Sequence, residues 1–568
     1  MKKSRKRLVG TAVALSSLAL LLTGCSSGTS NTTASNSASA SGDQGPIDAA
    51  HSVGAMDNYA VGTTFKASEP IDISLLYRDH PNYPVKDSWM IFQQLQANQN
   101  VTFTRTEIPL SDWQTKRGLV ITGGDAPELM PVFYTGEETQ YVSSGALLPI
   151  SDYVQYMPNF EKILNDWGLS DYLDTKRQSD GKYYLLPGLM QTAKQQYSII
   201  VRDDAWKAAG ITSDPQTMDD LQADLQKLKT LGTCGVPLSA ANNASDILQA
   251  FSPGYNTAMG AWALQGSGVV WDSTQNKHVY AGEQDGYKQL VQYMANLVSS
   301  GLMDPESLTQ STSDNSAAEA KFASSQSCAI TGNDQNAITY QQDLVNAGVN
   351  TTVHMLMIPD GPFGGYIPGG ARFSSGMIFS AKLADDPHFK AILQFVDWLY
   401  FSEQGIEFAQ WGVQCPTGVT DSTQCTYTKD ASGNRTLLPD IRNSQGLGDP
   451  NAPKLLNTDY GFSNGVFWPA NGTYNDLMMS YYSKMEQDFM NSMSNKKELA
   501  TPPATPMDAD TLETVGNMYN SLKDITQQNL VQFILGQKSM SDWDSYVSQL
   551  QSASVDQYVQ LYNDNVKQ

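Results

Sequence analysis

Hydrophobic and polar positions follow two different periods along the chain, and the two periods alternate. Residues 71–76 and 101–108 have the two-residue period of strands, and residues 129–133 form a short apolar run. Residues 89–98 and 113–121, which lie between these segments, carry apolar side chains at helical spacing. Strands that alternate with helices at this distance predict parallel βαβ units and an α/β fold.

The same alternation returns further along the chain and then gives way to helices alone. The later strands are predicted at residues 182–186, 197–202, 235–238, 353–358 and 375–379. The later helices are predicted at residues 217–231, with Thr217 as N-cap, 287–299, 388–400, 508–535, 543–550 and 555–566. We therefore expect a helical region packed on the C-terminal part of an α/β body.

The first residues have the pattern of an export signal. A basic segment precedes an apolar run at residues 8–22, which is shorter than the roughly 20 apolar residues of a membrane span. The run ends in Leu-Thr-Gly-Cys at residues 22–25, which resembles the lipobox of bacterial lipoproteins. The resemblance implies a signal peptide at residues 1–24 and a lipid on Cys25. An ordinary signal peptide cut near a chance cysteine is the alternative.

The next stretch is rich in Ser, Thr, Asn and Gly and has no apolar period. Such a sequence cannot bury enough surface to offset its ordering entropy, so residues 25–64 are interpreted as a lipidated flexible tether. The folded body is expected from Phe65 onward. Together these segments predict a protein held by its lipid on the extracellular face of the cytoplasmic membrane.

Charge and cysteine content narrow the function further. The full chain has a net charge of -22, and all the charged residues of the signal peptide are basic, so its removal makes the chain more acidic. Nucleic acid is therefore not expected as a partner. A soluble, monomeric body is expected instead. The four cysteines of the body suggest two disulfides, Cys415 with Cys425 and Cys234 with Cys328, or else buried free thiols. The histidines are scattered and no C-x-x-C occurs, so no metal site is expected.

Several segments resemble the solute-binding lipoproteins of carbohydrate ABC transporters, in particular the long family 1 members. These segments are GGDAPELMPV (123–132), DGKYYLLPG (180–188), IIVRDDAWKAAGI (199–211), GLMDPES (301–307), PHFKAILQFVDWLYFSEQG (387–405) and QFILGQKSMSDWDSYVSQL (532–550). The resemblance implies a two-lobed, periplasmic-binding-protein-like (type II) α/β fold, with hinge strands between the lobes and a helical C-terminal region. One lobe would comprise residues 65–190 and 360–470, and the other residues 191–359 and 471–568.

The resemblance also implies a function. A carbohydrate, expected to be an oligosaccharide, would bind between the lobes, and the closed protein would deliver it to permease subunits in the membrane. Relatives often carry an Asp/Asn-rich calcium loop, but the matching stretch here, residues 231–238, has no carboxylate. No calcium and no other cofactor is therefore expected, and Cys234 is free to cross-link that loop.

Sugars present apolar ring faces and hydroxyl groups, so aromatic and polar side chains at strand ends and in Gly-rich loops are the binding candidates. The candidates are Tyr77, Arg78, Asp79, Tyr134, Tyr141, Gln191, Tyr197, Trp262, Tyr366, Arg372, Trp411 and Trp468. A solvated turn is the alternative for residues 77–79, and a surface ion pair is the alternative for Arg372. For Tyr141 and the three tryptophans the alternative is a place in the core.

Two other classes of function compete with this reading. A secreted glycoside hydrolase needs two carboxylates at a fixed separation, and neither such a pair nor eight βα repeats can be recognised. G-x-S-x-G occurs at residues 24–28, over the predicted cleavage site, and at residues 461–465, but neither lies between a strand and a helix predicted above, which disfavours a serine hydrolase. A peptide-binding lipoprotein of similar architecture stays open, although Gly-rich loops with aromatic residues favour sugar. The sequence thus predicts a binding protein and not an enzyme.

Overall fold

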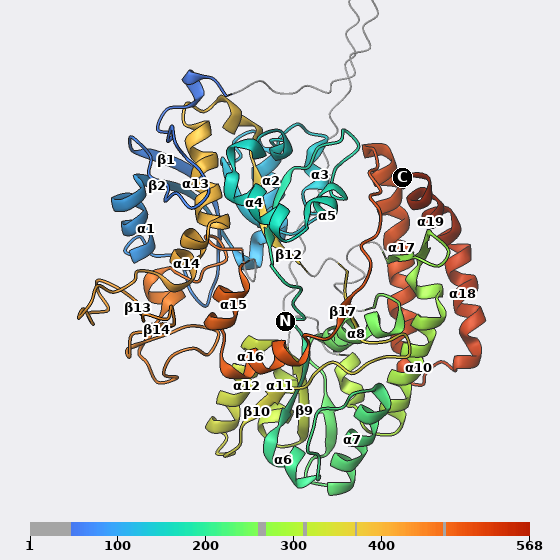
Figure 1. Cartoon of the computed structure of the whole chain (residues 1–568). Coiled ribbons are helices and arrows are strands. Elements are labelled where there is room, and N and C mark those ends of the chain that lie inside the picture. The colour runs from blue at the N-terminus through green and yellow to red at the C-terminus, as the bar shows by residue number, and fades with distance from the viewer. Residues whose placement is uncertain (1–46, 260–267, 310–314, 370–371, 470–472, 568) are drawn as a thin grey trace, which may run out of the picture. The chain divides into compact units, whose positions relative to one another are not determined.

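The computed structural model describes residues 47–259, 268–309, 315–369, 372–469 and 473–567. Two separate β-sheets, each with a large hydrophobic core of its own, make up the body (Figure 1). This confirms the two-lobed α/β fold. The predicted signal peptide and Cys25 lie outside the described residues. Within the described ranges, no helix has the length and apolarity needed to cross a membrane.

The first sheet has the strand order β2-β1-β3-β12-β4. Its strands are β1 (Ile71–Asp79), β2 (Val101–Pro109), β3 (Leu129–Phe133), β4 (Leu185–Leu189) and β12 (Phe373–Phe379). β1 runs parallel to β2 and β3, whereas β12 runs antiparallel to β3 and β4. Four strands therefore end, and β12 begins, at one edge of the sheet. We call this edge the carboxyl edge of the first lobe.

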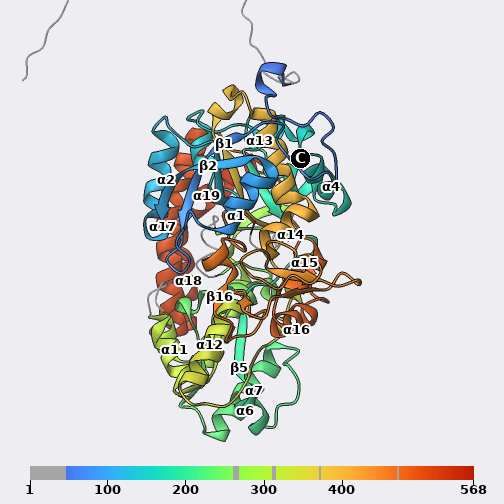
Figure 2. The same cartoon turned by 90° about the vertical axis from the view of Figure 1, so that its left-hand side faces the viewer.

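Helices and two small β-pairs complete the first lobe. The helices are α1 (Met90–Gln94), α2 (Trp113–Thr122), α3 (Thr139–Val142), α4 (Pro158–Asp166), α5 (Ser170–Asp174), α13 (Phe389–Phe401), α14 (Glu403–Trp411) and α15 (Asn475–Tyr481). The small pairs are β13 (Tyr427–Lys429) with β14 (Arg435–Leu437), and β15 (Ile441–Arg442) with β16 (Lys454–Leu455). Helix α13 packs on α4 and α14 (Figure 2) and buries every residue except Lys390, which explains why its sequence is mostly apolar.

The second sheet has the order β10-β5-β9-β6. Its strands are β5 (Ser198–Arg202), β6 (Val236–Ser239), β9 (Ser327–Gly332) and β10 (Val353–Met355). β6 runs parallel to β9, and β5 runs antiparallel to β9 with Ser198 opposite Gly332. The carboxyl ends of β6 and β9 therefore lie at the edge where β5 begins. This is the carboxyl edge of the second lobe.

The second lobe holds most of the helices, and the C-terminal ones stand together on one side (Figure 1). They are α6 (Asp203–Ala208), α7 (Met218–Leu231), α8 (Ser245–Phe251), α10 (Asp285–Ser299), α11 (Ser316–Ala323), α12 (Asp334–Asn346), α16 (Lys484–Ser492), α17 (Ala509–Ile534), α18 (Trp543–Ser552) and α19 (Val555–Asp564). A hairpin of β7 (Val269–Asp272) and β8 (Lys277–Tyr280) packs on α19. Thr217 caps α7 in a capping box with Asp220, as its position in the sequence predicts.

Three segments link the two sheets. Residues 190–197 run from the end of β4 to the start of β5, so they join the two carboxyl edges. The second segment contains β11 (Tyr366–Ile367), which pairs with β17 (Lys497–Glu498), and it leads into β12. The third joins α15 to α16. Ile367 packs in the second core and Leu477 in the first, so both limits lie later in the chain than the expected 360 and 471.

The N-terminal limit of the body also differs from the expected one. Residues 47–64, which the sequence assigns to the tether, pack on the first lobe. The Tyr59 hydroxyl donates to Asp397 Oδ2 at 2.8 Å, and the Met56 N–H donates to Gln394 Oε1 at 2.9 Å. The apolar residues of this stretch follow no regular period, so a reading of periodicity does not reveal that it packs on the body.

The structure contains both cysteine pairs that the sequence suggests. Cys415 and Cys425 are linked with a Cα–Cα distance of 5.0 Å, and Cys234 and Cys328 with 5.8 Å. The second bond ties the loop after α7 to strand β9. Among the residues described, no group of three or more His, Cys, Asp or Glu side chains is arranged to hold a metal ion.

Candidate functional site

Tyr134 and Tyr197 stand at the carboxyl edges of the two lobes. Tyr134 follows β3, and its side chain is among the most exposed large hydrophobic groups, with 53% of its surface accessible. Tyr197 precedes β5 in the other lobe. Burial raises the pKa of Tyr197 first, and the groups of Asp246 and Tyr134 raise it further. The Tyr134 hydroxyl therefore lies within electrostatic range of Tyr197.

Tyr83 joins this group from the turn that follows β1. Asp79 Oδ1 accepts from the Val85 N–H at 2.9 Å and so fixes the turn. Within the turn, the rings of His80 and Tyr83 stack with their centroids 4.4 Å apart. Burial and then Tyr134 raise the pKa of Tyr83, while Arg78 lowers it. Asp79 therefore shapes the turn, and Arg78 and Tyr83 lie beside Tyr134.

The second lobe contributes a polar, strained turn after β6. Three successive residues without a glycine, Asn242, Asn243 and Ala244, have φ of 49°, 54° and 58°. The Asn242 side-chain amide donates to both carboxylate oxygens of Asp246, at 2.9 and 3.0 Å. Burial raises the pKa of Asp246 to about 7. Backbone strain of this kind concentrates at ligand sites because only a specific role maintains it.

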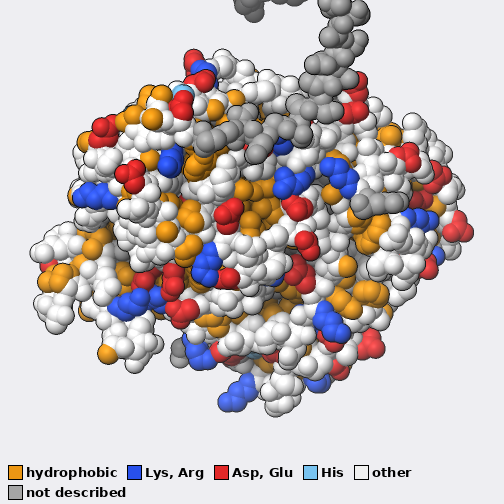
Figure 3. Space-filling model, turned by 45° about the horizontal axis from the view of Figure 1, so that its top comes forward, with side chains coloured by type: hydrophobic (Ala, Val, Ile, Leu, Met, Phe, Trp, Pro, Cys, Tyr) orange, Lys and Arg blue, Asp and Glu red, His pale blue; other side chains and the backbone are white. Residues whose placement is uncertain are grey.

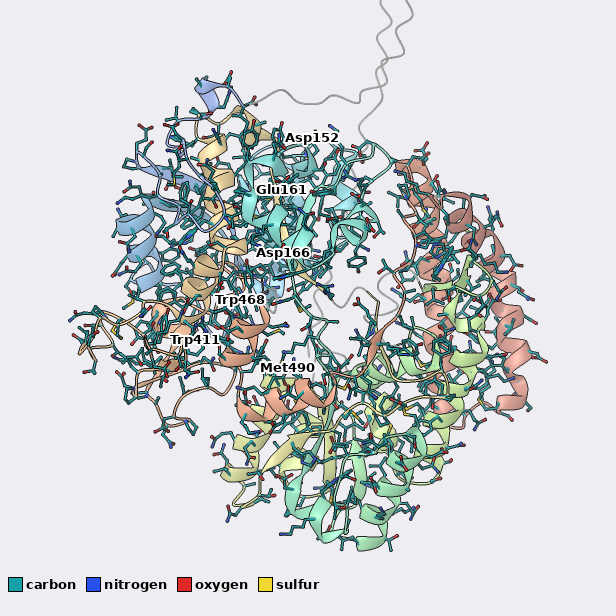
Figure 4. All side chains as sticks on the ribbon, viewed as in Figure 1. Asp152, Glu161, Asp166, Trp411, Trp468 and Met490 are labelled. Atoms are coloured by element: carbon teal, nitrogen blue, oxygen red, sulfur yellow. A yellow bond between two sulfur atoms is a disulfide. The ribbon has the colours of Figure 1, made fainter. Side chains whose placement is uncertain are left out.

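A hollow of about 520 Å³ lies among the three linking segments. Gln191, Arg372 and Asn475 supply polar groups to it, and Met490 of α16 is one of four methionines in its wall (Figure 4). Arg372 Nε donates to the Met190 carbonyl at 3.1 Å, and burial lowers the Arg372 pKa. Gln191 Oε1 accepts from the Asn475 N–H at 3.0 Å. These two predicted residues thus lie at the links between the lobes.

A buried ionic cluster lies directly beside this hollow. Lys194 Nζ contacts Glu486 Oε1 at 2.9 Å, and these side chains are only 2% and 1% exposed. The same ammonium lies 3.8 Å from the centre of the Tyr482 ring. Burial alone would lower the Lys194 pKa, but Tyr482, Asp334 and Glu486 together raise it. The cluster ties the first linking segment to the third and to the start of α12.

The other predicted site residues lie elsewhere. Trp411 and Trp468 are buried in the core of the first lobe, where both pack on Tyr481 (Figure 4). Tyr77 is also buried, and its hydroxyl accepts from Asn464 Nδ2 at 2.8 Å. Tyr141 is a core residue next to Arg117. The Tyr366 ring packs on the Phe363 ring, with their centroids 5.1 Å apart. Trp262 falls outside the described residues.

Sequence reasoning missed four residues at the facing edges, namely Tyr83, Asn242, Asp246 and Asn333. Asn333 follows β9, caps α12 and hydrogen-bonds to Tyr197. The position directly after a strand is the signal that could have found it. That signal was lost because β9, Ser-Cys-Ala-Ile-Thr-Gly, is too short and too uniformly buried to show a period.

The family model of the bacterial extracellular solute-binding proteins matches residues 90–430, which is more than half of the chain. The chain belongs to this family. A comparison with curated protein sequences gives no match.

Solved structures of other solute-binding proteins have the same fold. An extracellular solute-binding protein from Bifidobacterium longum subsp. infantis has a TM-score of 0.64 at 16% identity, covering 89% of this chain and all of that one. The structure of the alginate-binding protein AlgQ2 without calcium ion has a TM-score of 0.61 at 14% identity, and the match covers 89% of this chain and 99% of that one. The S. pneumoniae ABC-transporter substrate-binding protein FusA, in complex with kestose, has a TM-score of 0.60 at 17% identity, and the match covers 87% of this chain and 98% of that one.

Proposed function

We propose that this solute-binding protein captures a carbohydrate, in particular an oligosaccharide, and delivers it to the permease of an ABC importer. The observation that carries the proposal is the exposed ring of Tyr134 at the carboxyl edge of one lobe, with Tyr197 at the carboxyl edge of the other. Tyrosine rings cover the apolar faces of sugars, and their hydroxyls and the neighbouring asparagines pair with sugar hydroxyls. The names of the structurally similar proteins, which bind alginate and kestose, support the same class of ligand.

Three linking segments allow the lobes to close on a ligand. A ligand that touches Tyr134 and Tyr197 together gains contacts only in the closed form, so it stabilises that form by its differential affinity. The proposed site comprises Tyr83, Arg78, Tyr134, Tyr197 and the turn at residues 242–244. Gln191 and Arg372 lie at the links, where they contribute to closure.

The direct test is titration calorimetry with kestose, maltotriose, chitotriose and a short alginate oligomer, followed by recovery of each sugar. The proposal expects saturable binding of at least one of them, and recovery of the sugar intact. Binding of peptides but of no sugar would assign the protein to the peptide-binding class. Catalytic cleavage of a bound sugar would assign it to the glycoside hydrolases.

We further propose that the mature protein is a monomer tethered by a lipid on Cys25. The lipobox-like Leu-Thr-Gly-Cys and the polar stretch behind it support this. On the face shown in Figure 3, acidic and basic side chains are interspersed, which is typical of a surface in contact with water. Mass spectrometry of the membrane fraction should find a diacylglycerol on Cys25, and a Cys25→Ala variant should be lost from that fraction.

A further inference from the structure

The loop that presents Tyr134 begins with a strained bulge. Gly376 pairs with Phe133 and Met377 pairs with Pro131, so Val132 has no partner in the adjacent strand. Val132 has a φ of 66°, a conformation that a β-branched residue rarely adopts. A bulge changes the direction in which a strand leaves its sheet, and bulges recur beside ligand sites. Here the redirected residues are Phe133 and Tyr134.

A buried arginine on α2 supports the redirected segment. Arg117 is 4% exposed, and its guanidinium donates to both carboxylate oxygens of Glu137, at 2.8 and 3.0 Å. It also lies 4.8 Å from the centre of the Phe133 ring. A planar, bidentate pair of this kind fixes orientation as well as distance.

Glu137 transmits this support to Tyr134. Its Oε2, which accepts from Arg117, also accepts from the Tyr134 backbone N–H at 2.9 Å. The next residue, Glu138, is buried, and its Oε2 accepts from the Gly136 N–H at 2.7 Å. The loop around an exposed ring is therefore fixed at two backbone amides, by the partly buried Glu137 carboxylate and the buried Glu138 carboxylate. An exposed loop that served only as a connection would not need such bonds.

We propose that Arg117 and Glu137 are positioning residues for ligand binding, which hold the exposed ring of Tyr134 toward Tyr197 of the other lobe. This inference rests on the proposed function for its consequence in binding, but not for its structural content. Neither residue touches the ligand. Each acts by fixing the platform in advance, so that the ligand does not lose affinity to ordering of the loop.

A double-mutant cycle tests the inference, with titrations of kestose, maltotriose and chitotriose. Arg117→Met and Tyr134→Ala should each weaken binding roughly tenfold, and the double variant should be within about twofold of Tyr134→Ala alone. Arg117→Lys, which retains the charge but not the bidentate geometry, should lie between wild type and Arg117→Met. This variant also serves if Arg117→Met does not fold. Losses that add fully in the double variant would overturn the proposal.

Arg435 offers a matched control in the same lobe. Its side chain is 3% exposed and pairs with Glu407 at 2.6 Å and Asp476 at 2.9 Å, in the β13–β14 hairpin and away from Tyr134. Arg435→Met should lower stability as Arg117→Met does, but leave affinity within about twofold of wild type. An equal loss of affinity in both variants would mean that Arg117 acts only through general stability, and the inference would be wrong.

Hydrogen exchange separates this inference from the proposed function. In Arg117→Met, the Tyr134 amide should exchange faster than in wild type or Arg435→Met, because the Glu137 carboxylate that accepts its hydrogen bond loses its fixed position. If wild type binds none of the sugars, the proposed function fails while this measurement still decides the positioning role. Unchanged exchange at the Tyr134 amide would refute that role even if sugars bind.

Discussion

Two groups of aromatic residues in this protein lie in opposite settings. Trp411, Trp468, Tyr481 and Tyr482 form a buried aromatic group, in which the Trp411 and Tyr481 rings are 5.8 Å apart. Tyr83, Tyr134 and Tyr197 form an edge aromatic group at the carboxyl edges of the two sheets. Glycine-rich surroundings do not distinguish the groups. What does distinguish them is position relative to the ends of parallel strands.

The comparison assigns different work to the two groups. Rings of the buried group pack on one another, with Tyr481 against Trp411, Trp468 and Tyr482, and contribute to the free energy of folding. In the edge group, Tyr134 keeps 53% of its surface accessible. We therefore expect substitutions in the buried group to change stability and those in the edge group to change affinity.

The largest expected effect comes from Trp411→Ala. The ring is fully buried, so its removal should lower the free energy of unfolding by about 3–5 kcal/mol through lost burial and a residual cavity. Urea denaturation measures this loss. Affinity for the sugar should be unchanged under conditions where the variant is folded, and a specific loss of affinity would place Trp411 in the edge group.

A somewhat smaller loss of stability is expected from Lys194→Met. Lys194 belongs to the first linking segment, and its ammonium lies over the ring of Tyr482, a member of the buried group. The substitution leaves Glu486 buried without its cation, which should cost about 3 kcal/mol. Burial already raises the Glu486 pKa to about 7, so the variant should take up a proton there. The double variant Lys194→Met/Glu486→Leu is the control. It should regain most of the stability, and failure to do so would exclude the ion pair as the cause.

Tyr134→Ala tests the other side of the comparison. Loss of an exposed stacking ring should weaken sugar binding by about 1.4 kcal/mol, which is tenfold, and leave unfolding within about 0.5 kcal/mol of wild type. Tyr134→Phe retains the ring and should bind nearly as wild type does. A destabilised Tyr134→Ala with wild-type affinity would remove the distinction between the groups.

The smallest effect concerns pH, and it involves neither group. His354 lies between Asp203, at 2.5 Å, and Asp214, at 3.5 Å. Burial lowers its pKa, but the two carboxylates prevail and raise it from 6.5 to about 9. Its stabilisation is therefore complete below pH 6.5 and is lost as pH rises through 9. Since the side chain is a third exposed, we expect a loss of about 1 kcal/mol.

Thermal unfolding between pH 6.5 and 9 measures this loss, and His354→Gln should flatten the dependence. Any change in sugar affinity over the same range should follow Asp246, whose pKa burial raises to about 7, and not His354, whose pKa is about 9. A parallel fall in affinity would connect His354 to the site and break the separation of stability from binding.

The sequence predicted the strands and helices well where periodicity was strong. The apolar run at 129–133 is β3, and the segment at 217–231 is α7 with its cap at Thr217.

Site residues were predicted less well. The carboxyl-end rule found Tyr134, but Gly-rich context led to Trp411 and Trp468, which are core residues. A buried cation such as Arg117 is invisible in sequence, because its partner Glu137 is twenty residues away and surface pairs have the same composition.

The three linking segments have a mechanical consequence. Two bodies joined by one strand can swivel about many axes, whereas each added connection removes freedom of rotation. With three connections, one of them stiffened by the Lys194–Glu486 contact, the halves of this protein are restricted to bending and cannot twist freely. The two lobes should then open and close by the same bending motion. Pulling the halves apart in a single-molecule experiment should load all three chains at once and give one rupture event instead of a stepwise release.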